Sequence, residues 1–441
     1  MNFKVFIISN IMCWKGLYVI GTRMPRYVFL SLLLASGSAQ AGTLPQLFMQ
    51  ALSHHPKVMA QHAVIEVNKV GVVTAEWQYY PTVSASYETV SASVTDSSFA
   101  GASDVTTLRI EQPLWSGGRL SAGVDVATSK VALENVQLQV VKINIAESVL
   151  QAYGKWVSGY QTMQAWGRGL AVHKDLENQV QNRVDHGVSA PIDLALAKGR
   201  VASTHAQYLA AKSEAQLALD EINQLTQSQF THQNLVQDLS ASASVMVNLN
   251  DRDMWAKAQL IDPQIALAQS EIALAQVELK QQKASIFPSV YFRAEQQVNS
   301  FSNAQAGSSM RFFVGLSGQS GAGLSLLSKN NAAIAMVAAK EAALVSVKYS
   351  KRQTLINLVT KIDSLHYQIN ALSSAMEATL AVSKSYSRQF LAGRKTWQEV
   401  LNSAREQVQM EVQIVDLKAA VLVAQWRLAL NTSDLTISGD S

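Results

Sequence analysis

The sequence predicts a mixed α/β membrane protein in which long antiparallel helices are joined to short amphipathic strands, in an arrangement that occurs twice. The first observation is an internal repeat: Pro56 and Pro81 stand 25 residues apart, and Pro263 and Pro288 repeat this spacing 207 residues later. The second is two very long heptad patterns, and the third is four strand-like segments with one apolar face. Neither half can bury a core alone, so we expect a symmetric assembly rather than a globular enzyme.

Residues 1–41 have the features of an N-terminal extension and secretory signal peptide. An apolar run at 27–35 follows Arg26, and Ala39-Gln40-Ala41 has the A-x-A pattern of a cleavage site. Met24 is an alternative start. A transmembrane anchor is disfavoured because the apolar run is shorter than a bilayer requires.

Removal of the signal peptide changes both the charge and the cysteine content. The only cysteine, Cys13, lies in the removed segment, so the mature chain has neither disulfides nor thiol chemistry. The segment also holds four of the 36 basic residues and none of the 32 acidic ones, which leaves 32 of each sign. A neutral mature chain gives no support to a nucleic-acid partner.

The hydrophobic patterns divide the mature chain into two repeats, 42–228 and 254–431, with a polar equatorial linker at 229–253 and a C-terminal tail at 432–441. Each repeat is expected to contain a helix, two strands, a long helix and a shorter helix. The expected elements of the first repeat are 44–78, 82–95, 105–114, 118–185 and 191–228, and those of the second are 254–285, 289–298, 310–318, 322–390 and 395–431.

The long helices carry coiled-coil seams. Apolar residues recur every seven positions in the first, and in the second they alternate steps of three and four. These residues are Val124, Val131, Leu138, Ile145 and Ala152, and Leu355, Leu358, Ile362, Leu365, Ile369, Leu372 and Met376. Such seams need partner helices along their whole length, and the two half-length helices of each repeat, placed end to end, match one long helix.

The four strand-like segments alternate apolar and polar residues over about ten positions, as outer-membrane barrel strands do. In 289–298, for example, Val290 and Phe292 share one face while Arg293 and Glu295 share the other. Single-chain barrels begin at about eight strands, so several chains must share one barrel if these strands enter lipid, which leaves two or three subunits open. The alternative is a soluble antiparallel sheet packed on helices.

Short motifs recur in order along both halves. They are Ala-Leu-Ser-His-His-Pro at 51–56, Tyr80-Pro81 and Phe287-Pro288 at strand entries, Gln-Pro-Leu-Trp-Ser-Gly-Gly at 112–118 with Pro113, Gly117 and Gly118 at a strand exit, and glycine turns at Gly187 and Gly393. Over essentially the whole mature sequence the chain thereby resembles the TolC family of outer-membrane export ducts. Residues 318–323 depart from the pattern, where a Pro-Leu-aromatic-x-Gly-Gly stretch is expected.

The resemblance implies a homotrimer in the cell outer membrane. Each chain would contribute four strands to a 12-stranded barrel in the lipid and four helical columns to a 12-helix tunnel in the periplasm. The tunnel tip would dock a periplasmic membrane-fusion adaptor fed by an inner-membrane ABC transporter. Residues 393–397 and 403–407 look most like ducts of type I secretion systems that export large biofilm adhesins.

The resemblance also assigns roles at the tip. Gly187, Val188, Ser189, Gly393 and Arg394 would form the adaptor-docking turns. For the periplasmic gate, the implied residues are an acid–base link between Asp193 and Lys395, a constriction carboxylate at Glu399, Asn402 in place of a second acid, and Phe390 in place of a tyrosine. As an alternative, the glycines are plain connectors, and Asp193 and Glu399 are first-turn acids that complement helix N-termini.

Two other functions remain open at this stage. An outer-membrane component of a multidrug or metal efflux pump would use the same fold, and a periplasmic coiled-coil scaffold would use the helices alone. No catalytic constellation, cofactor motif or metal-ligand spacing supports an enzyme. His54 and His55 are adjacent, so one helix face cannot present both to a metal.

Overall fold

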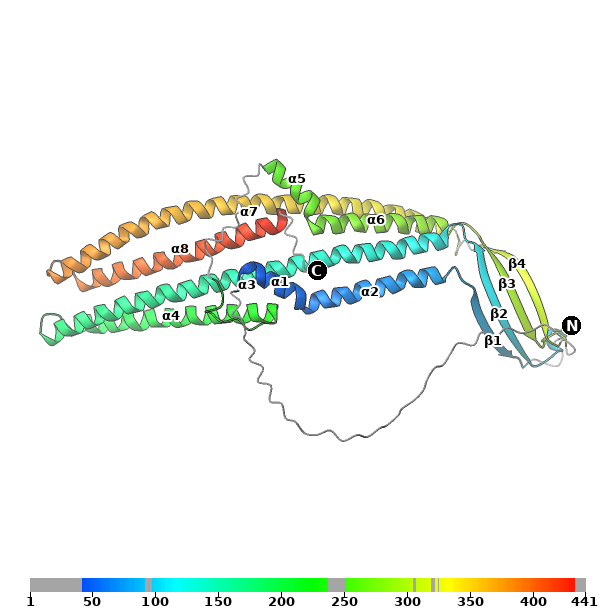
Figure 1. Cartoon of the computed structure of the whole chain (residues 1–441), viewed down its shortest axis with the longest axis horizontal. Helices are drawn as coiled ribbons and strands as arrows, with labels where there is room; N and C mark the ends of the chain where they lie inside the picture. The colour runs from blue at the N-terminus through cyan, green and yellow to red at the C-terminus, as the bar shows by residue number, and fades with distance from the viewer. Residues whose placement is uncertain are drawn as a thin grey trace, which may run out of the picture. The chain divides into compact units, whose positions relative to one another are not determined.

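The computed structural model describes residues 42–91, 97–236, 251–303, 307–318, 322–323 and 325–432, which all belong to one compact unit, Ala41–Ser441. The expected signal sequence, most of the linker and nearly all of the tail lie outside these ranges. Within them, two helices, two strands and two helices follow one another twice (Figure 1). The elements are α1 (Leu44–His54), α2 (Pro56–Trp77), β1 (Thr82–Thr89), β2 (Asp104–Trp115), α3 (Arg119–Asp185), α4 (Pro191–Thr226), α5 (Asp251–Ile261), α6 (Pro263–Ala284), β3 (Ser289–Val298), β4 (Ser309–Ser317), α7 (Ser325–Leu391) and α8 (Trp397–Thr432).

The helices expected at 44–78 and 254–285 are each broken into two, which corrects the sequence interpretation. His55 and Asp262 adopt extended backbones, with ψ of 129° and 117°. Each precedes a proline, whose ring disfavours the helical conformation of the residue before it. The side chains of His55 and Asp262 then cap the next helix by accepting hydrogen bonds from backbone N–H groups.

The two long helices agree with the expected ones to within three residues at each end. α3 and α7 have 67 residues each, or about 100 Å at 1.5 Å per residue. The shorter helices α2 and α6 lie beside their strand-proximal halves, and α4 and α8 beside the distal halves (Figure 1). The seam positions Leu138, Ile145 and Leu355 are buried, as the heptads predict.

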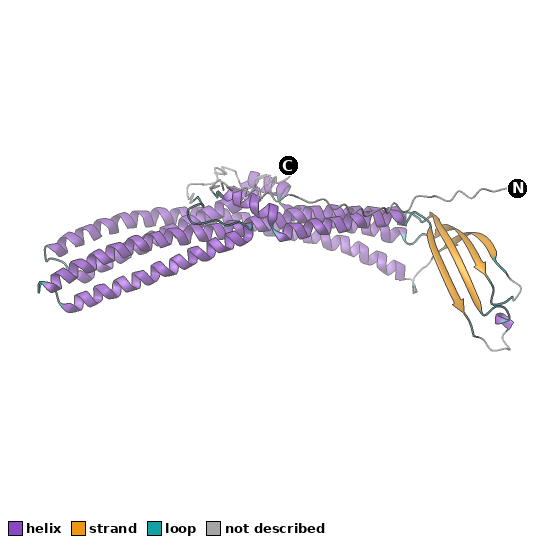
Figure 2. Cartoon of the chain, turned by 60° about the horizontal axis from the view of Figure 1, so that its bottom comes forward, coloured by secondary structure: helices purple, strands orange, loops and turns teal. Residues whose placement is uncertain are grey.

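The four strands form one antiparallel sheet in the order β1-β2-β3-β4, beyond the ends of α2 and α6 (Figures 1 and 2). β3 has the expected bounds, and β2 and β4 differ by one residue at their ends. β1 ends at Thr89 rather than 95, because the pairing closes where Val90 N–H donates to the carbonyl of Ser103. Of the remaining expected strand residues, 92–95 fall outside the described ranges.

The sheet has one apolar and one charged face. Val83, Ile110, Ala294 and Phe312 stand in register across the four strands on the apolar face, and Phe312 is 62 % exposed. The other face carries ion pairs across the strands. These are Arg109–Glu295 at 3.2 Å, Arg293–Glu111 at 2.8 Å and Arg311–Glu295 at 3.5 Å.

The main core lies at the middle of α3, where α1, α4 and α8 meet it. Trp156 is fully buried there, and its indole Nε1 donates to Nδ1 of His232 at 3.0 Å. Tyr153 donates its hydroxyl to the carbonyl of Val236 at 2.6 Å. The start of the linker is thus fastened to the helices. Of the helices described, none is both long and apolar enough to cross a membrane.

Candidate functional site

The candidate site is the pair of helix–helix turns at the end of the bundle away from the sheet (Figure 2). Gly187 and Gly393 both have φ of +71°, which favours glycine because a Cβ is strained there. In the first turn, Gly187 N–H donates to the Val184 carbonyl at 2.9 Å and Val188 N–H to the Arg183 carbonyl at 2.8 Å. The second turn repeats both bonds 206 residues later at the same distances. The predicted glycine turns are therefore present.

The second turn carries an ion pair at the start of α8. Lys395 Nζ lies 2.6 Å from Oε1 of Glu399 and 4.5 Å from the centre of the Tyr386 ring. Glu399 also accepts hydrogen bonds from the backbone N–H and hydroxyl of Thr396 at 3.0 and 2.8 Å. Its own backbone N–H donates to the Thr396 hydroxyl oxygen at 3.4 Å, and the two backbone bonds together make a capping box. The Lys395 hydrogen bond, and then those from Thr396, lower the pKa of Glu399 to about 2, while the same ion pair raises the pKa of Lys395.

The partner of Lys395 therefore differs from the one implied by the resemblance. Asp193 is partly buried on the first turn of α4, and no ion pair joins it to Lys395 within the described chain. Glu399 is only four residues further along the chain, at the start of α8, whereas Asp193 belongs to the other hairpin. Glu399 has the helix-capping role that the sequence left open as an alternative.

Phe390, which the resemblance places at the gate in place of a tyrosine, is buried within the single chain. It is 6 % exposed, its ring centre lies 5.1 Å from that of Trp397, and the Arg183 guanidinium stacks 4.7 Å above it. The surrounding cluster joins α3 and α4 to α7 and α8. Its members are Leu176, Val180, Ala197, Phe390, Trp397, Val400, Leu401 and Ala404. Within this chain Phe390 thus holds the two hairpins together.

The other residues assigned to the tip are mostly at the surface. Val188 is 62 % exposed, and Gly187, Gly393, Arg394 and Asn402 are exposed as well. Ser189 is partly buried, and its hydroxyl accepts a bond from Arg183 Nε at 3.3 Å. The turns present backbone and small side chains rather than a deep pocket.

The turns at the strand ends are also where the motifs place them. Pro81 and Pro288 directly precede β1 and β3, and Gly117 and Gly118 follow β2 with φ of +61° and +85°. A Cβ on Gly117 would lie 2.3 Å from that of Phe287, so only glycine fits. Pro113 lies inside β2, where the pairing with β3 shifts register, rather than beyond the strand. A proline is tolerated there because a bulge needs no ladder N–H.

Exposed aromatic side chains gather at the same level. Trp77 and Tyr80 lie 5.0 Å apart and are 64 % and 58 % exposed. Trp115 and Phe287 lie 6.4 Å apart and are 50 % and 57 % exposed. Aromatic residues of this kind form belts at membrane–water interfaces.

The described residues form no metal-binding site. No group of three or more His, Cys, Asp or Glu side chains there could hold a metal ion. His54 contacts the Ser53 hydroxyl at 2.7 Å, while His55 caps α2, so the two imidazoles serve separate local roles.

The sequence interpretation used Thr396 and Trp397 only as part of the segment 393–397 and assigned neither a role at the tip. A signal existed for the first, because Thr-x-x-Glu at 396–399 before an apolar run is a capping-box pattern. No local signal marks Trp397, because its burial depends on Arg183 and Phe390 packing from other helices.

The fold and the paired tips define a class of fold: two long helical hairpins joined to one four-stranded antiparallel sheet. The sequence model of the outer membrane efflux protein family matches residues 47–227, which span α1 to the end of α4. No curated protein sequence matches the chain. The family match and the fold agree with the predicted location in the outer membrane.

Solved structures share this fold over most of the chain. A membrane protein from Pseudomonas aeruginosa has 15 % identity and a TM-score of 0.76, over 88 % of this chain and 92 % of that one. CusC has 16 % identity and a TM-score of 0.73, over 91 % and 95 %. The outer membrane protein VceC from Vibrio cholerae has 17 % identity and a TM-score of 0.71, over 88 % and 95 %. These likenesses confirm the expected fold class.

Proposed function

We propose that the protein is the outer-membrane channel of a tripartite export system and acts as a passive conduit rather than an enzyme. The observation that carries this proposal is the sheet, whose exposed apolar face and ion-paired opposite face suit lipid and water. The match of residues 47–227 to outer membrane efflux proteins supports it. The helices continue from the sheet as a wall, because the two shorter helices beside each long helix together match its length.

The open edges of the sheet require an assembly of several chains, and we propose the homotrimer that the family resemblance implies. Among the described residues, β1 and β4 each pair on one side only, and unpaired edges in lipid leave backbone N–H and C=O groups unsatisfied. Three chains with four strands each would close a 12-stranded barrel. The expected assembly is a trimer in outer-membrane fractions that migrates as a heat-modifiable band. A periplasmic scaffold would give neither the fractionation nor the band.

The partners we propose are a periplasmic membrane-fusion adaptor at the exposed tip turns and an inner-membrane ABC transporter behind it. The proposed cargo is a large adhesin exported by type I secretion, on the strength of the segments 393–397 and 403–407. A drug or metal efflux role is the second candidate. The name of the matching family favours it.

The test is a deletion strain assayed for surface display of any giant repeat adhesin and for susceptibility to a panel of drugs, metals and detergents. We expect loss of the adhesin and of biofilm, with unchanged susceptibility. Normal display with hypersensitivity would contradict adhesin export and establish efflux. Complementation with the full-length gene is the control for both readouts.

We also propose that Asp193, Lys395, Glu399 and Asn402 surround the gate at the tip. Because Lys395 is bonded to Glu399 in the single chain, a link to Asp193 would need Lys395 to change partner on closure. The double variant Asp193→Ala with Lys395→Ala should raise single-channel conductance in planar bilayers, and Lys174→Ala on the exposed side of α3 should not. Equal conductance of the wild type, the double variant and Lys174→Ala, each folded as a trimer, would contradict a link between Asp193 and Lys395 that holds the gate closed.

A further inference from the structure

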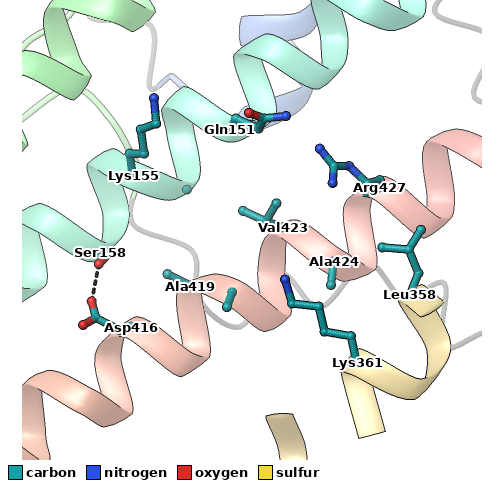
Figure 3. A pocket seen from close by; sticks show the side chains of 12 residues that line it. Gln151, Lys155, Ser158, Leu358, Lys361, Asp416, Ala419, Val423, Ala424 and Arg427 are labelled. Atoms are coloured by element: carbon teal, nitrogen blue, oxygen red, sulfur yellow. Dashed lines mark hydrogen bonds between the residues drawn. The ribbon is translucent and has the colours of Figure 1, made fainter. Parts of the chain in front are cut away.

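A groove with a volume of about 370 Å³ opens where α3, α7 and α8 meet (Figure 3). Gln151, Gly154, Lys155 and Ser158 line it from α3, and Leu358 and Lys361 from α7. The α8 wall carries three alanines, Ala419, Ala420 and Ala424, between Asp416 and Arg427. Small side chains on this wall leave room that larger ones would fill.

The acidic and basic groups around the groove are unevenly paired. Asp416 accepts a hydrogen bond from Ser158, and Lys155 is bonded to Glu221 of α4 at 3.0 Å. Lys361, an exposed lysine, makes no ion pair or hydrogen bond with the described part of the chain. Within the described chain, Lys361 and Asp416 therefore each lack an oppositely charged partner.

Arg427 is the second incompletely satisfied cation. Its Nε is buried and makes no hydrogen bond within the described chain, because Glu147, the acid that pairs with it, stays 3.7 Å away. A buried polar group without a hydrogen-bond partner costs free energy, and more so when it carries charge. Figure 3 shows Arg427 directed towards Gln151 and Lys361 extending from α7 towards α8. Two cations and an amide thus face one hollow.

We propose that this groove binds an oxyanion, a carboxylate or phosphate group, held by Lys361 and Arg427 and oriented by the Gln151 amide. A guanidinium and an ammonium are the groups that bind such oxygens most strongly, through charge-assisted hydrogen bonds. The hollow lies within the range of small-ligand sites. Every lining residue belongs to one chain, so each subunit carries its own site whatever cargo the channel conducts.

The experiment is isothermal titration of the purified full-length protein in detergent and phosphate-free buffer. Inorganic phosphate and a hexaglutamate peptide are the two probes, and hexaglutamine is the uncharged control. We expect one site per chain with an affinity that falls as sodium chloride is raised. Binding of phosphate alone would assign the site to a free anion, and binding of hexaglutamate alone to an acidic polypeptide.

Variants separate the groove from general surface charge. Lys361→Gln and Arg427→Gln should each weaken binding about tenfold, since each removes one charge-assisted bond. Lys361→Arg should bind as the wild type does, and Lys174→Gln, an exposed lysine on the distal half of α3, should change nothing. Trimer formation and circular dichroism confirm that each variant folds. No binding of either probe, or binding by the two Gln variants equal to that of the wild type, would overturn the proposal.

Discussion

The hairpins α3–α4 and α7–α8 have the same backbone geometry at their turns, but the side chains around the two turns differ. Both turn at a glycine with φ of +71°, and their closing hydrogen bonds have equal lengths. The starts of the following helices differ: Ile192, the second residue of α4, is 73 % exposed, while Trp397, the first residue of α8, is 4 % exposed. The repeat therefore preserves the turn geometry, while the side chains that join the hairpins are concentrated on the second.

The largest difference in stability between the two hairpins is expected when the buried Trp397 is replaced. Trp397→Ala removes a large side chain that packs on Phe390, and should lower the free energy of unfolding by about 3–5 kcal/mol. Ile192→Ala, near the start of the other hairpin's helix, should change it by less than about 0.5 kcal/mol. Guanidinium denaturation followed by circular dichroism in the far ultraviolet measures both. Equal losses would mean that the two helix starts are packed alike.

Trp397→Phe sharpens this result. The indole Nε1 of Trp397 is buried without a hydrogen-bond partner in the described chain, so the phenyl ring keeps most of the packing and removes an unsatisfied group. Trp397→Phe should lower the free energy of unfolding by much less than Trp397→Ala does. A loss as large as the alanine variant's would show that Nε1 has a partner in the assembled protein.

The first hairpin has its own fastening point, and it is sensitive to pH. His173 of α3 is 1 % exposed and lies 2.7 Å from the Thr204 hydroxyl of α4. Burial, and then the charge of Arg200, lowers the pKa of His173 from 6.5 to about 4. The unfolded chain therefore binds the proton more readily than the folded one. Stability is fully present above pH 6.5 and falls as the pH drops towards 4.

The expected loss across this window is about 3 kcal/mol, from the difference of the two pKa values. His173→Gln should flatten the dependence of stability on pH between 6.5 and 4. His205→Gln, which replaces an exposed histidine on α4, should leave the dependence as it is in the wild type. Chemical denaturation at half-unit pH steps gives the curve. A wild-type slope in His173→Gln would assign the acid sensitivity to another group.

Much of the architecture could be predicted from the sequence because its signals are periodic. Heptads and alternation are local patterns, so the long helices and β3 were found nearly to the residue. The breaks at His55 and Asp262 had a local signal too, in the prolines that follow them. The burial of Phe390 had none, because it depends on Arg183 and Trp397, which come from other helices.

The sequence predicted the candidate site only where the backbone conformation of the turns determines it. Glycine at a helix C-terminus specifies a left-handed turn, so both tips were placed correctly. The partner of Lys395 is a choice between two carboxylates, and nothing in the sequence ranks one four residues along the chain against one on the other hairpin. The structure ranks them by distance, at 2.6 Å from Glu399.

The two turns have the same backbone geometry, so the next prediction is that the same substitution lowers the stability of both hairpins equally. Gly187→Ala and Gly393→Ala each place a Cβ at a positive φ, at a cost of about 1–2 kcal/mol. Within the described chain, no neighbouring atom lies within 4 Å of the point where either new Cβ would stand, so strain alone decides the result. Thermal unfolding of the two variants should show equal falls. A clear inequality would break the equivalence of the turns.

The smallest expected difference concerns the two first-turn acids. Glu399→Gln removes the ion pair with Lys395 and weakens the capping box, while Asp193→Asn changes a side chain that makes no cap hydrogen bond on α4. Only the first should lower the unfolding temperature, and by less than Trp397→Ala does. Because the pKa of Glu399 is lowered to about 2, its contribution is complete above pH 4.5 and disappears only as the pH falls towards 2. The difference between wild type and Glu399→Gln should therefore persist at pH 4.5 and vanish near pH 2, and a difference already lost at pH 4.5 would mean that the carboxylate is unpaired in the trimer.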